Sequence, residues 1–131
     1  MCLYKKSYIP RIALRDITTY KVVYNYSTSD EDTFYTCYID NPIKLNQTYT
    51  GKFEQFHIYG LLKSFFKENI SDGFIHSYSE VHTAYLCKYN FMCYHPYNYK
   101  IVECVIPAGT LYFIGRYNEI ASRRLKYIKT I

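Results

Sequence analysis

The stretch that decides the fold is CVIPAGTLYFIG, residues 104–115, in which two apolar runs flank Pro107 and Gly109. Proline holds its φ at a value that suits a turn, and glycine adopts the positive φ that a short hairpin demands. On either side, residues 99–106 and 111–114 are rich in β-branched and aromatic side chains, which favour strands. The pattern therefore predicts a hairpin whose two strands pair with each other.

Similar runs of β-branched and aromatic residues recur along the chain and predict further strands. These runs cover residues 17–26, 34–39, 74–78 and 123–131. Residues 43–50 are expected to add a short extended piece that ends at Gly51. In the strand that precedes the hairpin, alternation places Val102, Cys104 and Ile106 on one face of the sheet.

The apolar spacing changes to a helical period in two places. Residues 61–69, LLKSFFKEN, are predicted to form a helix because their leucines and phenylalanines recur at helical spacing. A second helix is predicted over residues 80–89, with Ser79 as its N-cap. The residues expected to share one face of this helix are Val81, Ala84, Tyr85 and Lys88.

Length and composition indicate one packed domain. The chain has 131 residues, of which 49% are apolar, and this fits one domain well and two poorly. Strands with interspersed helices predict an α+β fold, with a mainly antiparallel sheet and about two packed helices. Residues 1–15 mix apolar and basic side chains around Pro10, and we expect them to form an irregular N-terminal arm of the single domain 1–131.

Tyrosines and basic residues determine the expected surface. The chain contains 18 tyrosines and no tryptophan. Tyrosine suits half-buried strands, and it also supplies amphipathic rings at contact surfaces and ligand walls. The net charge is +5, and arginines and lysines crowd the C-terminus. No nucleic-acid-binding motif accompanies them, so we expect a solvated basic face rather than specific nucleic-acid recognition.

The cysteines indicate a reducing compartment. There are five of them, an odd number, with no C-x-x-C pair and no secretory signal after Met1. We expect free thiols in a cytoplasmic protein, with Cys37 and Cys104 as small buried side chains within strands. No apolar run reaches the length of a membrane span, so no membrane association is expected.

The residues that could carry chemistry do not form a recognisable constellation. Five potential metal ligands lie close together in the sequence: His76, His82, Cys87, Cys93 and His95. Only Cys93 and His95 form a close pair, so no metal site is expected. The sequence contains no P-loop, dinucleotide fingerprint or H-E-x-x-H motif, and no spacing singles out a nucleophile or a carboxylate pair. The residues alone favour a binding protein without a cofactor over an enzyme.

Five segments, read in order, resemble a family of small proteins from phages and gut-bacterial mobile elements. They are PRIALRDITTYKVV, IKLNQTY, DGFIHSYSEVHTA, VECVIPAGTLYFIG and NEIASRRLKYIK, and they span most of the chain. The resemblance implies a cytoplasmic accessory protein of a phage or prophage, located in the host cell. It implies no particular activity, because none is assigned to the family.

The order of these segments also resembles a reduced ADP-ribosyltransferase fold. In that fold, a basic residue on the first strand and serines on a later strand shape an NAD pocket, and a late glutamate orients the nicotinamide ribose. The matching positions here are Lys21, Ser77, Ser79 and Glu119. Lys21 stands where the family has arginine, which grips phosphate with two contacts. Glu119 stands alone where the family has a Glu-x-Glu pair.

We therefore expect a non-catalytic phage accessory binding protein that acts in phage–host conflict. It would sequester a small nucleotide-like signal or block a host defence protein. The expected contact residues are tyrosines and arginines: Tyr94, Tyr97, Arg116, Tyr117, Arg123 and Arg124. The alternatives are an ADP-ribosyltransferase-like enzyme that uses NAD, and a minor virion or assembly component. A homodimer is compatible with the sequence, because tyrosine-rich faces often pair.

Overall fold

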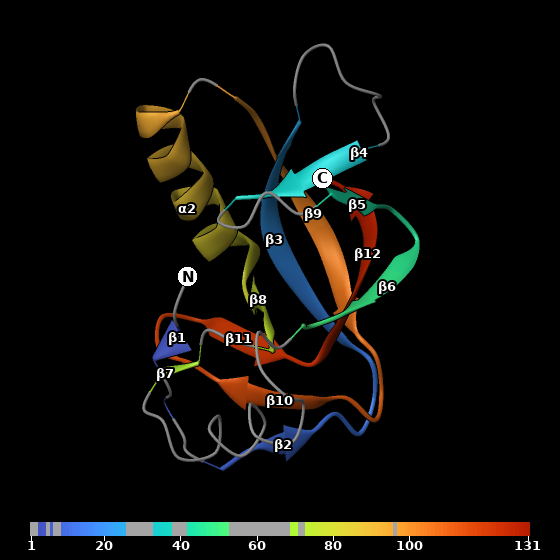
Figure 1. Ribbon diagram of the computed structural model, residues 1–131. Helices are drawn as coiled ribbons and strands as arrows, with labels where there is room; N and C mark the ends of the chain where they lie inside the picture. The colour runs from blue at the N-terminus through green and yellow to red at the C-terminus, as the bar shows by residue number, and fades with distance from the viewer. Residues whose placement is uncertain are drawn as a thin grey trace.

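The structure, a computed structural model, describes residues 3–4, 6, 9–25, 33–37, 42–52, 69–70, 73–95 and 97–131. Within these ranges the chain forms twelve strands and one helix (Figure 1). The strands are β1 (Leu3–Tyr4), β2 (Arg11–Ile12), β3 (Ile17–Asn25), β4 (Thr33–Thr36), β5 (Pro42–Lys44), β6 (Gln47–Thr50), β7 (Asn69–Ile70), β8 (Ile75–Tyr78), β9 (Asn98–Ile106), β10 (Leu111–Ile114), β11 (Glu119–Ser122) and β12 (Arg124–Thr130). The helix is α2 (Val81–Tyr94).

The four C-terminal strands form one long, bent hairpin. β10 pairs with β11 in antiparallel register, with Phe113 opposite Ala121. β9 pairs with β12, also antiparallel, with Cys104 opposite Tyr127. One arm of this bent hairpin is therefore β9 followed by β10, the other is β11 followed by β12, and the turn between β10 and β11 is its tip. One arm bends between β9 and β10, and the other bends at Arg123.

This arrangement corrects the prediction that β9 and β10 pair with each other. The predicted turn between them is present, because Gly109 has φ 83° and the Thr110 N–H donates to the Pro107 carbonyl at 3.2 Å. In the described sheet, however, β10 pairs with β11 and β2. The Gly109 N–H donates to the Ala13 carbonyl at 2.7 Å, and the Ala13 N–H donates to the Thr110 carbonyl at 2.9 Å. The turn is a corner that binds the N-terminal segment.

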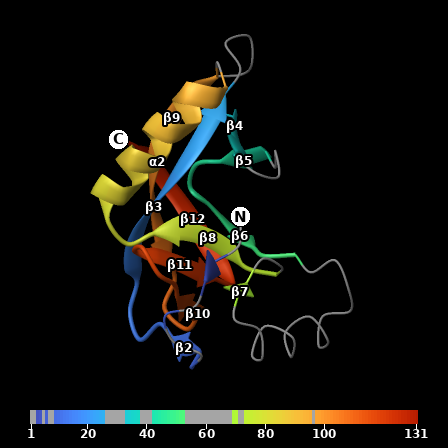
Figure 2. The same ribbon diagram turned by 90° about the vertical axis from the view of Figure 1, so that its left-hand side faces the viewer.

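The main sheet curls back on itself (Figures 1 and 2). Its strand order is β2-β10-β11-β8-β3-β9-β12-β6, and β4 and β5 extend it beside β3. Only Arg123 separates β11 from β12 in the chain. Across the sheet, however, β11 pairs with β8, β8 with β3, β3 with β9 and β9 with β12. The sheet therefore curls from β11 round to β12, the strand that continues β11 along the chain. The main core includes the side chains of Val23, Val102, Cys104, Leu125 and Tyr127.

The helix α2 forms a second layer against this sheet (Figure 1). Ala84 is completely buried, and Cys87 and Phe91, on the same side of α2, pack against the same cluster. The sheet residues of this second cluster are Val22, Tyr24, Tyr78, Tyr99 and Ile101. Val22 and Tyr24 of β3 thus face the helix, whereas Val23 between them belongs to the main core. This follows because successive side chains of a strand point to opposite faces.

The sequence predicted most strands and one of their faces correctly. β3, β8 and β12 match their predicted runs, and Val102, Cys104 and Ile106 lie together in the core as expected. β4 is shorter than its predicted run, and the extended piece expected before Gly51 is divided into β5 and β6. β11 was not predicted, because the turn at Tyr117 and Asn118 joins two paired strands and does not end the pairing.

The helix differs from the prediction at both ends. Its N-cap is Glu80, whose side chain makes no capping bond, and not Ser79. Ser79 instead donates from its Oγ to the Asn118 carbonyl at 3.3 Å. At the other end, α2 continues to Tyr94. The predicted face is also incomplete, because Tyr85 is 38% exposed.

Two other predictions concern regions that the structure describes only in part. The helix predicted over residues 61–69 lies outside the described residues, except that Asn69 belongs to β7. The described part of the chain thus forms a small, mainly antiparallel domain with a single helix. Of the predicted N-terminal arm, β1 pairs with β7 and β2 pairs with β10, and Ala13 is buried.

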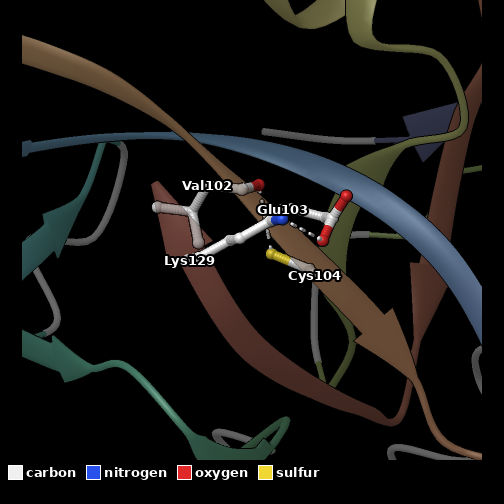
Figure 3. A network of polar contacts seen from close by, with 4 residues as sticks. All are labelled: Val102, Glu103, Cys104 and Lys129. Carbon is white, nitrogen blue, oxygen red and sulfur yellow. Dashed lines mark hydrogen bonds and ion pairs between the residues drawn. The ribbon is translucent and has the colours of Figure 1, made fainter. Parts of the chain in front are cut away.

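Adjacent residues of β9 point to opposite sides of the sheet (Figure 3). The Glu103 carboxylate lies 4.0 Å from the Lys129 ammonium on β12, in a partly exposed ion pair that contributes little to stability. The Cys104 Sγ points the other way and donates to the Val102 carbonyl at 3.5 Å. Burial confirms Cys104 as a core side chain, whereas Cys37 is only half-buried.

Candidate binding surface

A column of stacked rings crosses the layer between α2 and the sheet. The Tyr35 and Tyr24 ring centroids are 5.7 Å apart, and the Tyr24 and Tyr97 centroids are 4.8 Å apart. The His95 ring continues the stack 6.2 Å beyond Tyr97. We call Tyr35, Tyr24, Tyr97 and His95 the aromatic column. Tyr24 is only 3% exposed and Tyr97 is 42% exposed, so the column leads from the core to the surface.

The outer end of the column adjoins the last turn of α2. The Phe91 ring stacks on Tyr99 at 5.7 Å, and the N–H of His95 donates to the Phe91 carbonyl at 3.0 Å, so this end of the helix is held in place. Tyr94, the last residue of α2, is 75% exposed. We call Tyr94, His95 and Tyr97 the aromatic end surface. Tyr94 and Tyr97 are both predicted contact residues, and they lie together at the C-terminal end of α2.

Arg116 and Tyr117 lie at the tip of the bent hairpin, near the other end of α2. Tyr117 is 82% exposed. The Ser79 N–H donates to the Asn118 carbonyl at 2.8 Å, and the Asn118 side-chain amide donates to the Thr83 Oγ1 at 3.2 Å. These bonds fix the tip beside the first turn of the helix. Within a single chain, four of the six predicted contact residues therefore fall into two groups, with Tyr94 and Tyr97 at one end of α2 and Arg116 and Tyr117 near the other.

The remaining two predicted contact residues have roles inside the fold. The Arg123 guanidinium donates to the Gly51 carbonyl at 2.9 Å and to the Gly73 carbonyl, and it lies over the Phe74 ring at 5.7 Å. Arg124 is half-buried and donates to the Ala108 carbonyl at the long distance of 3.5 Å. Arg123 thus joins three segments of the chain, and its contacts account for its position without an external partner.

Of the residues that match the ADP-ribosyltransferase pattern, Lys21, Ser77 and Glu119 lie on three neighbouring strands, β3, β8 and β11, and Ser79 follows the end of β8. Their side chains do not share one face. Glu119 pairs with Tyr78, which pairs with Tyr20, so Glu119 lies on the face opposite Lys21. Ser77, which alternates with Tyr78, lies on the face of Lys21 instead. The geometry therefore gives no single pocket in which Lys21, Ser77 and Glu119 meet.

Burial shifts the pKa values of the ionisable groups of this region in the direction that favours their neutral forms. Loss of hydration lowers the pKa of Lys21, whose Nζ donates to the His76 carbonyl at 2.5 Å. Burial lowers the pKa of His76 to about 3 and raises the pKa of Cys104 to about 12. It also raises the pKa of Cys87, which accepts a hydrogen bond from Tyr78 at 3.0 Å. Neither the half-buried Cys87 thiol nor the buried Cys104 thiol is therefore an activated nucleophile at neutral pH.

Metal ligands do not gather in the part of the chain that the structure describes, where no three His, Cys, Asp or Glu side chains are placed to hold an ion. Cys93 and His95, the close pair in the sequence, are both exposed near the end of α2. No third ligand lies with them among the described residues.

The outer side of α2 is a second exposed feature, and it was not predicted from the sequence. Four large apolar side chains there are at least 38% exposed: Tyr85, Leu86, Tyr89 and Met92. We call these residues the α2 stripe. The signal was present in the sequence, because α2 contains apolar residues around its whole circumference, and only His82 and Lys88 among its residues can carry a positive charge. A helix that is apolar on all sides has more apolar surface than the sheet beneath it can cover.

Comparisons with known protein families, with curated proteins and with solved structures find no match to this chain. The resemblances to phage proteins and to ADP-ribosyltransferases therefore remain predictions. Among the described residues, no helix has the length and apolar content that crossing a membrane requires.

Proposed function

We propose that this protein is a non-catalytic binding module that recognises another protein through the aromatic end surface. The observation that carries the proposal is the aromatic column, which is buried at Tyr24 and exposed at Tyr97 and His95. Because its rings are already stacked in the free chain, little side-chain entropy is lost when a partner covers them. Tyrosine is also among the residues that most often anchor protein interfaces.

The setting that we propose is phage–host conflict, in which the module blocks a host defence protein. This setting comes from the resemblance to phage and mobile-element proteins. A blocking protein needs affinity and no chemistry of its own. The neutral, buried state of Cys104 and His76 supports a binding role over a catalytic one.

Capture from a bacterial extract tests this proposal. The immobilised parent chain is compared with the variants Tyr94→Ala and Tyr97→Ala. Leu14→Ala serves as the matched control, because Leu14 is a 96% exposed apolar residue two positions after β2, and β2 lies far from α2 in Figure 1. We expect one host protein to be retained by the parent and the control and lost from both tyrosine variants.

The captured protein is then purified and titrated calorimetrically against each variant. Loss of one anchoring ring should weaken binding by about tenfold or more. Equal retention by all variants, or no specific retention by the parent chain, would contradict the proposed recognition surface.

The aromatic column also favours a second candidate function, the sequestration of a nucleotide-like ligand. An exposed, pre-stacked ring accepts a nucleobase face, and each stack of this kind adds about 1–3 kcal/mol to binding. The test is an NMR titration with the four ribonucleoside monophosphates. Saturable shifts of the His95 and Tyr97 ring signals below about 1 mM ligand would favour this candidate over protein recognition. Unchanged spectra would exclude these nucleotides as ligands.

A further inference from the structure

The strand β6 has a neighbouring strand on one side only. It ends the strand order of the described sheet, next to β12, and Figure 1 shows it at the right-hand side of the molecule. The Gly51 N–H donates to the Arg123 carbonyl at 2.9 Å, so the backbone groups of Gly51 point towards β12. Because these groups alternate in direction along an antiparallel strand, those of Thr48 and Thr50 point away from β12. Both threonines are exposed, and their outward N–H and carbonyl groups form no hydrogen bond within the described part of the chain.

Two cations lie one strand in from this free edge. Thr48 is paired with Lys126 of β12, and Thr50 is paired with Arg124. Paired residues share a face of the sheet, and Leu125 between the two cations is buried in the core. Lys126 and Arg124 therefore lie with the two threonines on the outer face.

The surroundings of the edge are basic along its whole length. Lys44 comes before β6 and Lys52 after it, and both are exposed. Within the described ranges, neither of these lysines nor Lys126 forms an ion pair. Residues 42–52 and 122–131 contain no acidic residue. The free edge is thus a row of unpaired backbone groups among unpaired positive charges.

The backbone and the charges together determine which partner fits. Along the edge, N–H donors alternate with carbonyl acceptors, and another β-strand presents the complementary series. A nucleic acid presents only phosphate oxygens there, which the carbonyl oxygens repel. A second copy of β6 has the right backbone, but it brings Lys126 and Arg124 of one chain towards those of another in a protein of net charge +5. An extended segment with acidic side chains satisfies both the backbone and the charges.

We propose that the free edge of β6 binds an extended acidic segment of another protein, which adds a strand to the sheet. The backbone of this segment pairs with Thr48 and Thr50, and its outer-face carboxylates meet Lys126 and Arg124. The added strand lies about 10 Å from β12, a distance that the long side chains of both partners can span across the short threonines. The edge has only four residues, so the dissociation constant should be on the order of 10–500 µM.

A titration of the whole chain, followed by NMR, tests this site. The probe is a synthetic peptide of about eight residues, in which glutamate alternates with valine. One control peptide has lysine in place of glutamate. A second control keeps the glutamates but carries N-methyl groups on all its amides, so it retains its charge and cannot pair with a strand edge. Hydrogen exchange is followed at the Thr48 and Thr50 amides, and the Gly51 amide, which is already bonded to Arg123, is the internal reference.

Two variants separate backbone pairing from charge. Thr48→Pro removes an N–H that points away from β12, so the pairing of β6 with β12 is retained. Lys126→Glu reverses a charge beside the edge. Arg11→Glu is the matched control, because it makes the same change of charge at an exposed position on β2, the other end of the strand order. Circular dichroism verifies that each variant is folded.

We expect the glutamate peptide to bind the parent and Arg11→Glu with similar affinity. Near saturation it should slow exchange at Thr48 and Thr50 by about tenfold or more and leave Gly51 unchanged. Lys126→Glu and Thr48→Pro should each weaken binding by about tenfold. The lysine peptide and the N-methylated peptide should not bind.

Equal binding of the N-methylated peptide overturns strand addition, and it does so on the parent chain, whether or not Thr48→Pro folds. Equal binding of the lysine peptide, or equal weakening by Arg11→Glu and Lys126→Glu, overturns the acidic partner at this edge. Unchanged exchange at Thr48 and Thr50 with roughly 1 mM glutamate peptide overturns the site itself. Tyr94 and Tyr97 are unchanged throughout, so the outcome is independent of the function proposed for the aromatic end surface.

Discussion

His76 is a buried side chain whose polar atoms have no partner. It is 7% exposed, and neither ring nitrogen makes a hydrogen bond. Burial is the main reason that its pKa falls from 6.5 to about 3, and the charge of Lys21 lowers it further. The neutral imidazole is therefore tolerated in the fold, whereas the imidazolium ion is not.

This shift predicts a loss of stability in mild acid. Above pH 6.5 His76 is neutral in both the folded and the unfolded chain. Below pH 6.5 only the unfolded chain takes up a proton at His76, so the free energy of unfolding falls until the pH reaches about 3. Between pH 7.5 and 5.0 the loss should be about 2 kcal/mol. Urea unfolding at both values measures it.

His76→Leu removes this proton uptake and should remove most of the difference between the two pH values. The exposed His82 provides the control, since His82→Gln should keep the pH dependence of the parent. A parent chain that is equally stable at both pH values would show that the His76 ring is solvated or hydrogen-bonded in solution.

At the scale of elements, local chemistry was a good guide to turns and a poor guide to strand pairing. The turn at residues 107–110 has the proline and the left-handed glycine that the sequence indicated. The prediction that β9 and β10 pair with each other was wrong, because a turn determines only the local path of the chain. The Ala13 carbonyl and N–H, about a hundred positions upstream, take the hydrogen bonds that decide where β10 lies. No local pattern reports such a contact.

The tip of the bent hairpin is an element whose turn residues are unusual. Tyr117 and Asn118 have φ 59° and 60°, and the Glu119 N–H donates to the Arg116 carbonyl at 3.3 Å. Left-handed conformation at both central residues defines a type I′ turn, for which Asn-Gly is the preferred pair. A tyrosine at the first of these positions is strained, because its Cβ crowds the backbone.

Tyr117→Gly should therefore stabilise the protein. Glycine relieves the strain but gains freedom in the unfolded chain, so the expected net increase in the free energy of unfolding is about 0.5–1 kcal/mol. Chemical denaturation at low protein concentration measures this difference without a contribution from self-association. A decrease would mean that the Tyr117 ring makes stabilising contacts that outweigh the strain.

The candidate site was predicted only in part, because contacts between residues far apart in the chain leave no local pattern in the sequence. Tyr94 and Tyr97 could be selected because they occur in a tyrosine-rich stretch beside a helix end, and both are exposed. Arg123 could not be distinguished from Arg124 in the sequence, since its partners Gly51 and Gly73 lie 72 and 50 positions away. The α2 stripe was overlooked because a uniformly apolar helix gives no periodic signal for its exposed side.

At the scale of the whole molecule, Arg123 stands where the curled sheet changes direction. Its N–H donates to the Leu111 carbonyl at 2.9 Å and its carbonyl accepts from the Gly51 N–H at 2.9 Å, so the backbone is bound on both sides. Its guanidinium reaches the carbonyls of Gly51 and Gly73. Gly51 must be glycine, because a Cβ there would lie 2.2 Å from the Gly73 carbonyl oxygen.

Arg123→Ala should destabilise the whole fold. It leaves two carbonyl oxygens without their charged donor, and the expected loss is about 3 kcal/mol in the free energy of unfolding. Arg124→Ala removes only a long hydrogen bond and should cost less than about 0.5 kcal/mol. Both are measured by urea unfolding at one pH. Similar losses for the two variants would contradict the role assigned to the Arg123 guanidinium.

The bent hairpin also determines when the protein can fold during its synthesis. β2, β3, β6 and β8 pair with β10, β9, β12 and β11 respectively, so each of these four earlier strands has a partner that is translated later. While the ribosome is still reading codons before Asn98, these strands expose unpaired edges that invite aggregation and proteolysis. We therefore expect the nascent chain to be most open to aggregation and proteolysis until β9 to β12 have left the exit tunnel, and a slow codon just before β9 would lengthen that exposure.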